Sequence, residues 1–126
     1  MINVSARNRV GTGDDILIAG FNIAGTGTKQ LLMRAVGPGL AAFGVPGTLV
    51  DPKFELHSSA VAKLTENDNW TSSLATTFAS VGAFALQPGS RDAALLTTLP
   101  PGSYSVQVKG ADGGTGEALV EIYEVP

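Results

Sequence analysis

Side chains that commonly carry out catalysis are scarce in this chain. It contains one histidine, His57, and no cysteine, so it supplies neither a thiol nucleophile nor a closed zinc site of nitrogen and sulfur ligands. His57 lies between Leu56 and Ser58, on the polar phase of an alternating segment, and the Gly-x-Ser-x-Gly motif of a serine nucleophile is missing. The sequence therefore predicts a solvated strand position for His57 and a protein that is not an enzyme.

Oxygen-bearing side chains gather in three short segments and leave calcium open as the one conceivable cofactor. The candidate metal ligands are Asp14, Asp15, Glu66, Asp68 and Asp112. Their spacing is not that of an EF-hand, and Asp and Asn are also the usual turn-forming residues, because they bond to their own backbone. Turn formation is the favoured interpretation of these positions, and no resident cofactor is expected.

The single tryptophan follows the richest of these segments and suggests a binding site. Trp70 comes directly after Asn67-Asp68-Asn69, so its ring would serve as a stacking platform for a sugar while the neighbouring amides and carboxylate bind hydroxyl groups. Aromatic residues make up only 6% of the chain, whereas glycan clefts usually present several rings. The alternative is a packed Trp70 that anchors the loop to the core, and this is the favoured interpretation.

Arg34 interrupts an otherwise apolar run, from Leu31 to Val36. A charge in such a segment must reach the surface or find a carboxylate, and the candidate partners are Asp51 and Asp92. We expect a structural ion pair. The less favoured alternative is that Arg34 binds a ligand.

Composition predicts one all-β domain that spans residues 1–126. The chain is 44% hydrophobic and only 15% charged, which excludes intrinsic disorder, and its 16 glycines and 7 prolines favour turns over long helices. A net charge of −3 provides no basic field for nucleic acid. No apolar run is long enough to insert into a membrane, and the first residues lack the pattern of a signal peptide, so an exported form would have lost its signal.

Apolar runs separated by glycine and proline predict eight or nine strands in an antiparallel sandwich, either jelly-roll-like or Greek key. Alternation over Ser103–Lys109, followed by glycines and a second apolar run over 118–125, predicts a C-terminal hairpin. A second pair is predicted over 15–23 and 30–36, with both faces of each strand covered. The three Gly-Thr-Gly fragments are assigned to turns, because no Lys-Ser/Thr or helix follows them to hold a phosphate.

The remaining elements are predicted from shorter patterns. Alternation at Phe54 and Leu56 and the run 60–64 indicate another hairpin, and 93–99 forms a strand that must stop at Pro100. Apolar spacing over Ser73–Val81 predicts the one short helix, capped by Ser72 or Ser73, with a single further turn over 38–43.

Several segments resemble a β-sandwich module of large secreted or surface proteins of environmental bacteria. They include Arg9-Val10-Gly11-Thr12-Gly13-Asp14-Asp15, Leu32-Met33-Arg34-Ala35-Val36-Gly37-Pro38-Gly39-Leu40, Gly44-Val45-Pro46-Gly47, Asp51-Pro52, Phe54-Glu55-Leu56-His57, Asn67-Asp68-Asn69-Trp70 and Leu99-Pro100-Pro101-Gly102-Ser103-Tyr104. The ending, 100–125, is also similar to the last hairpin of bacterial pre-peptidase C-terminal domains. This resemblance implies export and a role in binding or assembly, and it transfers no active-site residue.

The expected function is that of a non-enzymatic extracellular or cell-surface module for structure or adhesion, associating with itself or with neighbouring copies. High apolar content and low charge favour such packing. The alternative is a polysaccharide-binding module with the site Asn67, Asp68, Asn69 and Trp70. A hydrolase is the least favoured, since it would need a carboxylate pair from Asp14, Asp15, Asp68 or Asp92.

Overall fold

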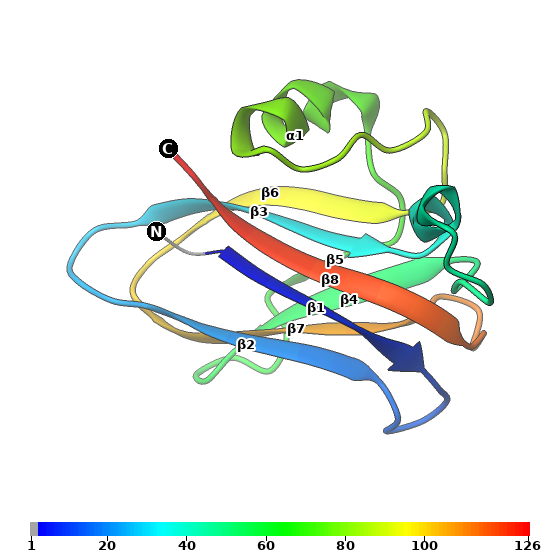
Figure 1. Cartoon of the computed structure of the whole chain (residues 1–126). Coiled ribbons are helices and arrows are strands. Elements are labelled where there is room, and N and C mark those ends of the chain that lie inside the picture. Colours follow the sequence, from blue (N-terminus) through cyan, green and yellow to red (C-terminus); the bar gives the residue numbers. More distant parts are fainter. Residues whose placement is uncertain (1–2) are drawn as a thin grey trace.

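The computed structural model describes residues 3–126 as two antiparallel sheets of four strands each, packed face to face (Figure 1). Sheet A has the order β1-β8-β3-β6, formed by β1 (Asn3–Val10), β8 (Gly116–Val125), β3 (Lys29–Val36) and β6 (Ala93–Leu99). Sheet B has the order β2-β7-β4-β5, formed by β2 (Leu17–Ile23), β7 (Gly102–Gly110), β4 (Pro52–Ser58) and β5 (Thr65–Asn67). The prediction of an all-β sandwich with one short helix is confirmed.

Most connections cross from one sheet to the other, and two predicted hairpins are therefore wrong. The C-terminal strands β7 and β8 lie in different sheets, and so do β2 and β3. Their glycine-rich connections contain Gly25 and Gly113, both at positive φ, and carry the chain across the sandwich. Glycine favours a tight turn in either kind of connection, so the local sequence does not distinguish a hairpin from an arch.

Within the described chain, β4 and β5 are the one pair of consecutive strands that are hydrogen-bonded neighbours. The predicted second strand, 60–64, is instead mostly loop, and β5 begins after it. Ser58 explains the loop, because its hydroxyl accepts a hydrogen bond from the backbone N–H of Val61 at 2.8 Å. Pairing resumes where the N–H of Leu64 donates to the carbonyl of Leu56 at 2.7 Å.

The helical predictions are confirmed in position. The predicted turn is the 3₁₀ helix η1 (Pro38–Phe43), and the predicted helix is the 3₁₀ turn η2 (Ser72–Leu74) followed by α1 (Ala75–Val81). The predicted cap is wrong, because no side chain caps either N-terminus. Gly82 ends α1 in the left-handed conformation, as is common at helix C-termini.

The two sheets bury a shared core and differ on their outer faces. β2 alternates strictly between buried and exposed residues, with Ile18 55% exposed, whereas β3 is buried on both faces from Leu31 to Val36. Coverage of both faces was thus predicted correctly for β3 and wrongly for β2. The reason is that α1 and its neighbouring loops lie over sheet A (Figure 1).

A second apolar cluster fills the space between sheet A and this helical layer. Its buried members are Leu32, Val36, Leu40, Trp70, Phe78, Ala83, Leu86 and Ala94. These residues come from β3, η1, β6, α1 and the loops around α1, so the cluster fixes the helical layer against the sheet. None of the helices among residues 3–126 has the length and hydropathy needed to cross a membrane.

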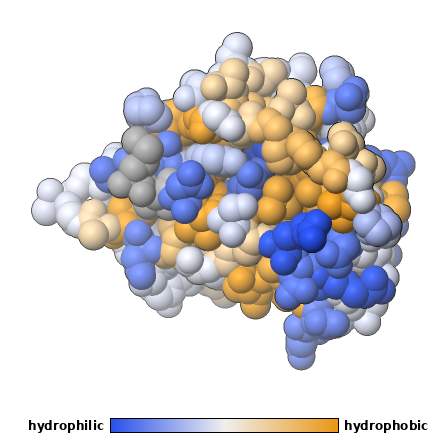
Figure 2. All heavy atoms as spheres, viewed as in Figure 1, coloured by the Kyte–Doolittle hydropathy of each residue, from blue (hydrophilic) through white to orange (hydrophobic). Residues whose placement is uncertain are grey.

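The surface in Figure 2 mixes apolar and polar regions. Its most hydrophilic atoms gather at the lower right, where β1 ends and the chain turns toward β2 in Figure 1. Apolar atoms are visible across much of the remaining face. Among residues 3–126, five large hydrophobic residues are exposed, namely Ile18, Phe43, Val50, Val61 and Leu64.

Candidate functional site

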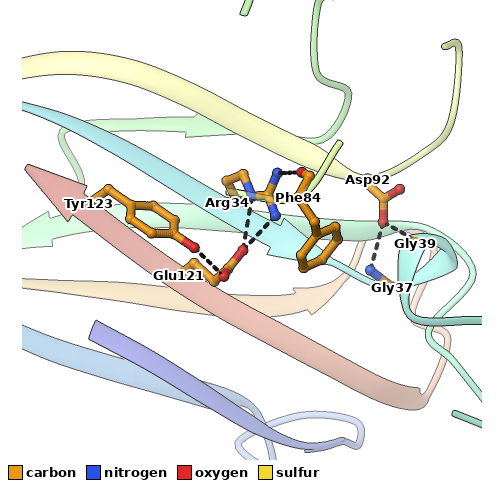
Figure 3. Close-up of polar contacts among 7 residues, drawn as sticks. All are labelled: Arg34, Gly37, Gly39, Phe84, Asp92, Glu121 and Tyr123. Atoms are coloured by element: carbon orange, nitrogen blue, oxygen red, sulfur yellow. Dashed lines mark hydrogen bonds and ion pairs between the residues drawn. The ribbon is translucent and has the colours of Figure 1, made fainter. Parts of the chain in front are cut away.

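Arg34 lies at the centre of a buried polar network on the outer face of sheet A (Figure 3). Its Nη2 and Nε donate to the same oxygen, Oε1 of Glu121, at 2.7 and 3.0 Å. Its Nη1 donates to the carbonyl of Phe84 at 2.7 Å. The guanidinium carbon lies 4.7 Å from the ring centre of Phe78 and 4.4 Å from that of Phe84, which places the cation between two aromatic rings.

The partner of Arg34 is therefore Glu121, and the predicted partners Asp51 and Asp92 are wrong. Register explains the pairing, because Arg34 on β3 lies directly opposite Glu121 on β8. Glu121 also accepts a hydrogen bond from the hydroxyl of Tyr123, and burial, followed by this bond, raises the pKa of Tyr123 to about 12. Arg34 is fully buried, so these contacts hold the sheet and the loop after α1 together.

Asp92 is buried at the end of sheet A and binds backbone rather than a cation. Its Oδ1 accepts hydrogen bonds from the N–H groups of Gly37 and Gly39 at 2.8 and 3.1 Å, which fixes the start of η1 (Figure 3). Its Oδ2 accepts from the hydroxyl of Ser90 at 2.7 Å. Gly37 also lies against the backbone of Leu49, because a Cβ at position 37 would lie 2.1 Å from the carbonyl oxygen of Leu49.

Asp51 lies elsewhere in the same end of the sandwich. Its Oδ2 is 3.9 Å from Nη1 of Arg91, a long and exposed ion pair. Its Oδ1 is buried and has no hydrogen-bond partner in the described residues. The three residues predicted as one structural ion pair thus belong to three separate sets of contacts.

Trp70 is part of the core between sheet A and the helical layer. It is 9% exposed, and its ring lies 5.3 Å from that of Phe78. Its indole N–H donates to Ser90 Oγ at 3.1 Å, which links the tryptophan through that hydroxyl to Asp92. This is the favoured interpretation from the sequence, a tryptophan that anchors its loop.

The neighbouring residues of the predicted binding loop do not form a common site with Trp70. The side-chain oxygen of Asn67 accepts the backbone N–H of Ala94 at 3.0 Å, which ties β5 to β6. Asp68 and Asn69 are exposed and bond to each other at 3.1 Å. The loop therefore has an inner half that supports the fold and an outer half that faces solvent.

The five candidate metal ligands are dispersed, and no group of three acidic or histidine side chains within residues 3–126 is arranged to hold a metal ion. Glu66 lies between Lys53 and Lys63, at 2.7 and 3.0 Å from their amines. Asp112 Oδ1 accepts the N–H of Gly114 at 2.9 Å, a turn contact. Asp15 also closes a turn, since its backbone N–H donates to Thr12 and its carbonyl accepts from Gly11.

His57 belongs to a charged ladder on the outer face of sheet B. Its Nε2 is 3.0 Å from Oε1 of Glu55, whose Oε2 is 2.8 Å from Nζ of Lys109. The hydrogen bonds from Lys109 and then His57 lower the pKa of Glu55 to about 2. Beside it, the bond to Glu66 raises the pKa of Lys53, and the pKa of Glu66 is lowered in turn.

A hollow lies at the end of the sandwich where β4 and β6 finish. This end groove has a volume of about 330 Å³ and is lined by Ser58, Ser59, Ala60, Leu64, Leu99, Pro100, Pro101, Gly102, Ser103 and Tyr104. A more open hollow of about 240 Å³ adjoins it and shares its serines and Tyr104. The lining is mostly apolar with a serine rim.

Sequence reasoning missed Glu121 and the end groove. Glu121 had a signal, because it is an acidic residue inside an apolar strand just as Arg34 is a basic one. The groove had none, since its two sides come from the β4–β5 loop and the β6–β7 connection, which are about forty residues apart in the chain.

Comparison with known proteins gives a match in fold. No protein-family model matches the chain, and no curated protein matches it. Among solved structures, it is similar to the pre-peptidase C-terminal domain of a collagenase from Bacillus anthracis, with a TM-score of 0.60 and 14% identity over 97% of this chain and 90% of that one. A glucanotransferase from Paenibacillus sp. aligns with a TM-score of 0.40 and 14% identity, over 98% of this chain and 16% of that one.

The collagenase domain agrees with the similarity inferred from the sequence over 100–125. It extends that likeness from one segment to nearly the whole chain. At 14% identity, what the two chains share is the sandwich fold.

Proposed function

We propose that this chain is a non-enzymatic structural module of the cell exterior that associates with further copies of itself. Support comes first from the fold, which is similar to that of a domain named for its C-terminal position in a collagenase. The sequence resemblance to modules of secreted and surface proteins supports the same location.

The observation that carries the proposal is the distribution of polar and apolar groups. The buried polar side chains, Arg34, Glu121 and Asp92, all bond to protein groups that they hold in place. Exposed apolar groups, by contrast, occur at both ends of the sandwich, at the end groove and around Phe43. Exposed apolar surface of this kind favours association between proteins.

The polysaccharide-binding alternative has less support. It requires an exposed aromatic face, whereas Trp70 is buried against Phe78 and its indole N–H is bonded to Ser90. Only Asp68 and Asn69 of the predicted site are exposed, and they bond to each other.

Light scattering across a hundredfold range of protein concentration tests the association. We expect the weight-average mass to rise above 12.8 kDa as the concentration increases. A constant monomer mass over the whole range would contradict self-association. For location, protease added to intact source cells should degrade the chain, and protection until lysis would contradict an exterior site.

A further inference from the structure

We propose that two copies associate through β2, which pairs antiparallel with β2 of the second copy and joins their B sheets into one continuous sheet. This inference rests on the proposed self-association and specifies its contact. It is drawn from the unpaired edge of β2, from the residues of that strand and from the state of the other three sheet edges.

β2 forms one edge of sheet B and leaves a row of backbone groups unpaired. Within residues 3–126 it is hydrogen-bonded to β7 alone, in an unbroken register from Leu17 opposite Val108 to Ile23 opposite Gly102. Figure 1 shows β2 along the lower side of the sandwich, with no strand beyond it. Alternate residues of an antiparallel edge direct their N–H and C=O groups away from the sheet, where a further strand can bind them.

The residues of β2 include none of the usual features that protect an edge. The strand has no charged residue, no proline and no bulge. Its side chains alternate between core and solvent, and Ile18 on the outer face is 55% exposed. Natural edge strands commonly carry a charge, a proline or a bulge that prevents pairing with another molecule. The edge of β2 is therefore suited to accept another strand.

The other three edges are each obstructed. β1 carries Arg7 and Arg9, both exposed, and charges on an edge disfavour a further strand. β5 has only three residues, too few for an extended pairing. On β6, the backbone N–H of Ala94 already donates to the side-chain oxygen of Asn67 at 3.0 Å. Of the four edges, β2 is thus the one most open to a partner strand.

Gly20, at the middle of β2, has no role within one copy that requires glycine. Its φ is not positive, and the one described atom within 4 Å of a Cβ built there is the carbonyl oxygen of Tyr104, at an ordinary 3.8 Å. Glycine inside a strand costs stability relative to alanine, and it often marks the close approach of another backbone. The proposed contact brings a second backbone to this position.

The sequence of β2 fits antiparallel pairing with itself about Gly20. In that register Gly20 lies opposite Gly20 of the second copy, Ile18 opposite Asn22, and Leu17 opposite Ile23. All seven residues are paired, and core-facing residues lie opposite core-facing ones. No like charges meet across the two-fold axis, where a charged strand would repel its own copy. This self-complementarity favours a second copy over an unrelated strand.

A two-fold contact of this kind closes at the dimer. It uses the same edge on both copies, so neither copy has a free β2 left for a third. The weight-average mass is therefore expected to rise with concentration and to level off at twice 12.8 kDa.

Two double variants on the outer face of β2 test the contact and its register. Ile18→Lys with Asn22→Lys places like charges opposite each other at two points across the two-fold axis. Ile18→Lys with Asn22→Glu places opposite charges at the same two points and leaves the net charge of the chain unchanged. Within one copy these positions lie opposite Gln107 and Ser103 of β7, which are uncharged.

The matched control adds two lysines to the other exposed edge. Asn3→Lys with Ser5→Lys gives the same change in net charge as the double-lysine variant of β2, at exposed positions of β1. Because all the substituted side chains are exposed, we expect the three proteins to fold, and circular dichroism with thermal unfolding checks this.

The readout is the dimerisation constant from sedimentation velocity. We expect the double-lysine variant of β2 to weaken association at least tenfold, because like charges directly opposite each other on paired strands are destabilising. The β1 control should stay within twofold of the unmodified protein. The Ile18→Lys, Asn22→Glu variant should stay within threefold, because its charges attract across the axis.

Hydrogen exchange of the unmodified protein gives a second readout that needs no substitution. The outward-directed amides of β2 should exchange more slowly as the concentration rises, since they become hydrogen-bonded in the dimer. Those of β1 should not change. Slowing confined to β1 would contradict the proposed contact.

The outcomes separate this inference from the proposal beneath it. If the unmodified protein dimerises but the double-lysine variant of β2 associates as strongly as the β1 control, the β2 contact is wrong and self-association stands. If the lysine–glutamate variant is as weak as the double-lysine variant, the register about Gly20 is wrong. If the unmodified protein stays monomeric at every concentration, both proposals are wrong, and the β2 edge is left for a strand of another protein.

Discussion

The outer faces of the two sheets carry similar ion pairs in opposite environments. On sheet A, the Arg34–Glu121 pair is closed at 2.7 Å beneath the α1 layer, with the arginine side chain fully buried. On sheet B, the Lys53–Glu66 pair is closed at the same 2.7 Å, with the two side chains 28% and 40% exposed. The two pairs have equal distances but are expected to differ in their contribution to stability. Loss of one partner leaves the other charge buried and unpaired on sheet A, whereas on sheet B the remaining charge is hydrated.

The buried pair should give the largest effect of any substitution considered for stability. Arg34→Met leaves Glu121 as a charge without its partner, and it removes the donor to the carbonyl of Phe84. We expect a loss of about 3–5 kcal/mol in the free energy of unfolding. Urea denaturation measures it, and a loss below about 1 kcal/mol would show that water enters the network freely.

Asp92 should give the next largest effect, on the same face. Asp92→Ala leaves the buried N–H of Gly37 without its acceptor, and that of Gly39 as well, so we expect a loss of about 2–3 kcal/mol. Asp112→Ala is the matched control, since it removes one contact to Gly114 in an exposed turn. Equal losses for the two variants would contradict the distinction between buried and exposed acceptors.

Glu55 offers a test of the ion pairs on the outer face of sheet B, through the dependence of folding stability on pH. Its pKa is lowered from 4.5 to about 2 in the folded protein by Lys109 and His57, so the folded state binds fewer protons than the unfolded one between these values. Its contribution is therefore present above pH 4.5 and lost as the pH falls toward 2.

The Glu55→Gln variant should accordingly be less stable than the unmodified protein at pH 7. We expect a difference of about 1 kcal/mol, because solvent screens this surface ladder. The two stabilities, measured by urea denaturation at a series of pH values, should converge on acidification. A difference that stays constant from pH 7 to pH 2 would contradict the role of the ionised carboxylate.

Lys53 should give the smallest effect. Lys53→Met removes a pair with the same closest distance as the buried one, yet we expect a loss within about 0.5 kcal/mol. Urea denaturation of Lys53→Met and Arg34→Met in the same series compares the stability losses of the exposed and the buried pair directly. Similar losses for the two variants would mean that burial does not decide the value of the pair.

The sequence predicted the fold class because strand composition and periodicity are local properties. Alternation over Ser103–Lys109 identified β7, and the apolar spacing of residues 73–81 identified α1. Strand pairing was not predictable in the same way. The glycines at 25 and 113 permit a sharp change of direction without specifying whether the next strand joins the same sheet or the opposite one.

The candidate sites show the same division. Burial of a charge in β3 was predictable from Arg34 alone, but its partner depends on the register of β3 against β8. The local sequence around Asp51 and Asp92 carries no information on that register. The end groove arises only when the β4–β5 loop meets the β6–β7 connection, so no single segment encodes it.

Light scattering of the unmodified protein over a hundredfold range of concentration tests the proposed self-association most directly. The weight-average mass should rise above 12.8 kDa as the concentration increases. A mass that stays at that of the monomer over the whole range would contradict the account.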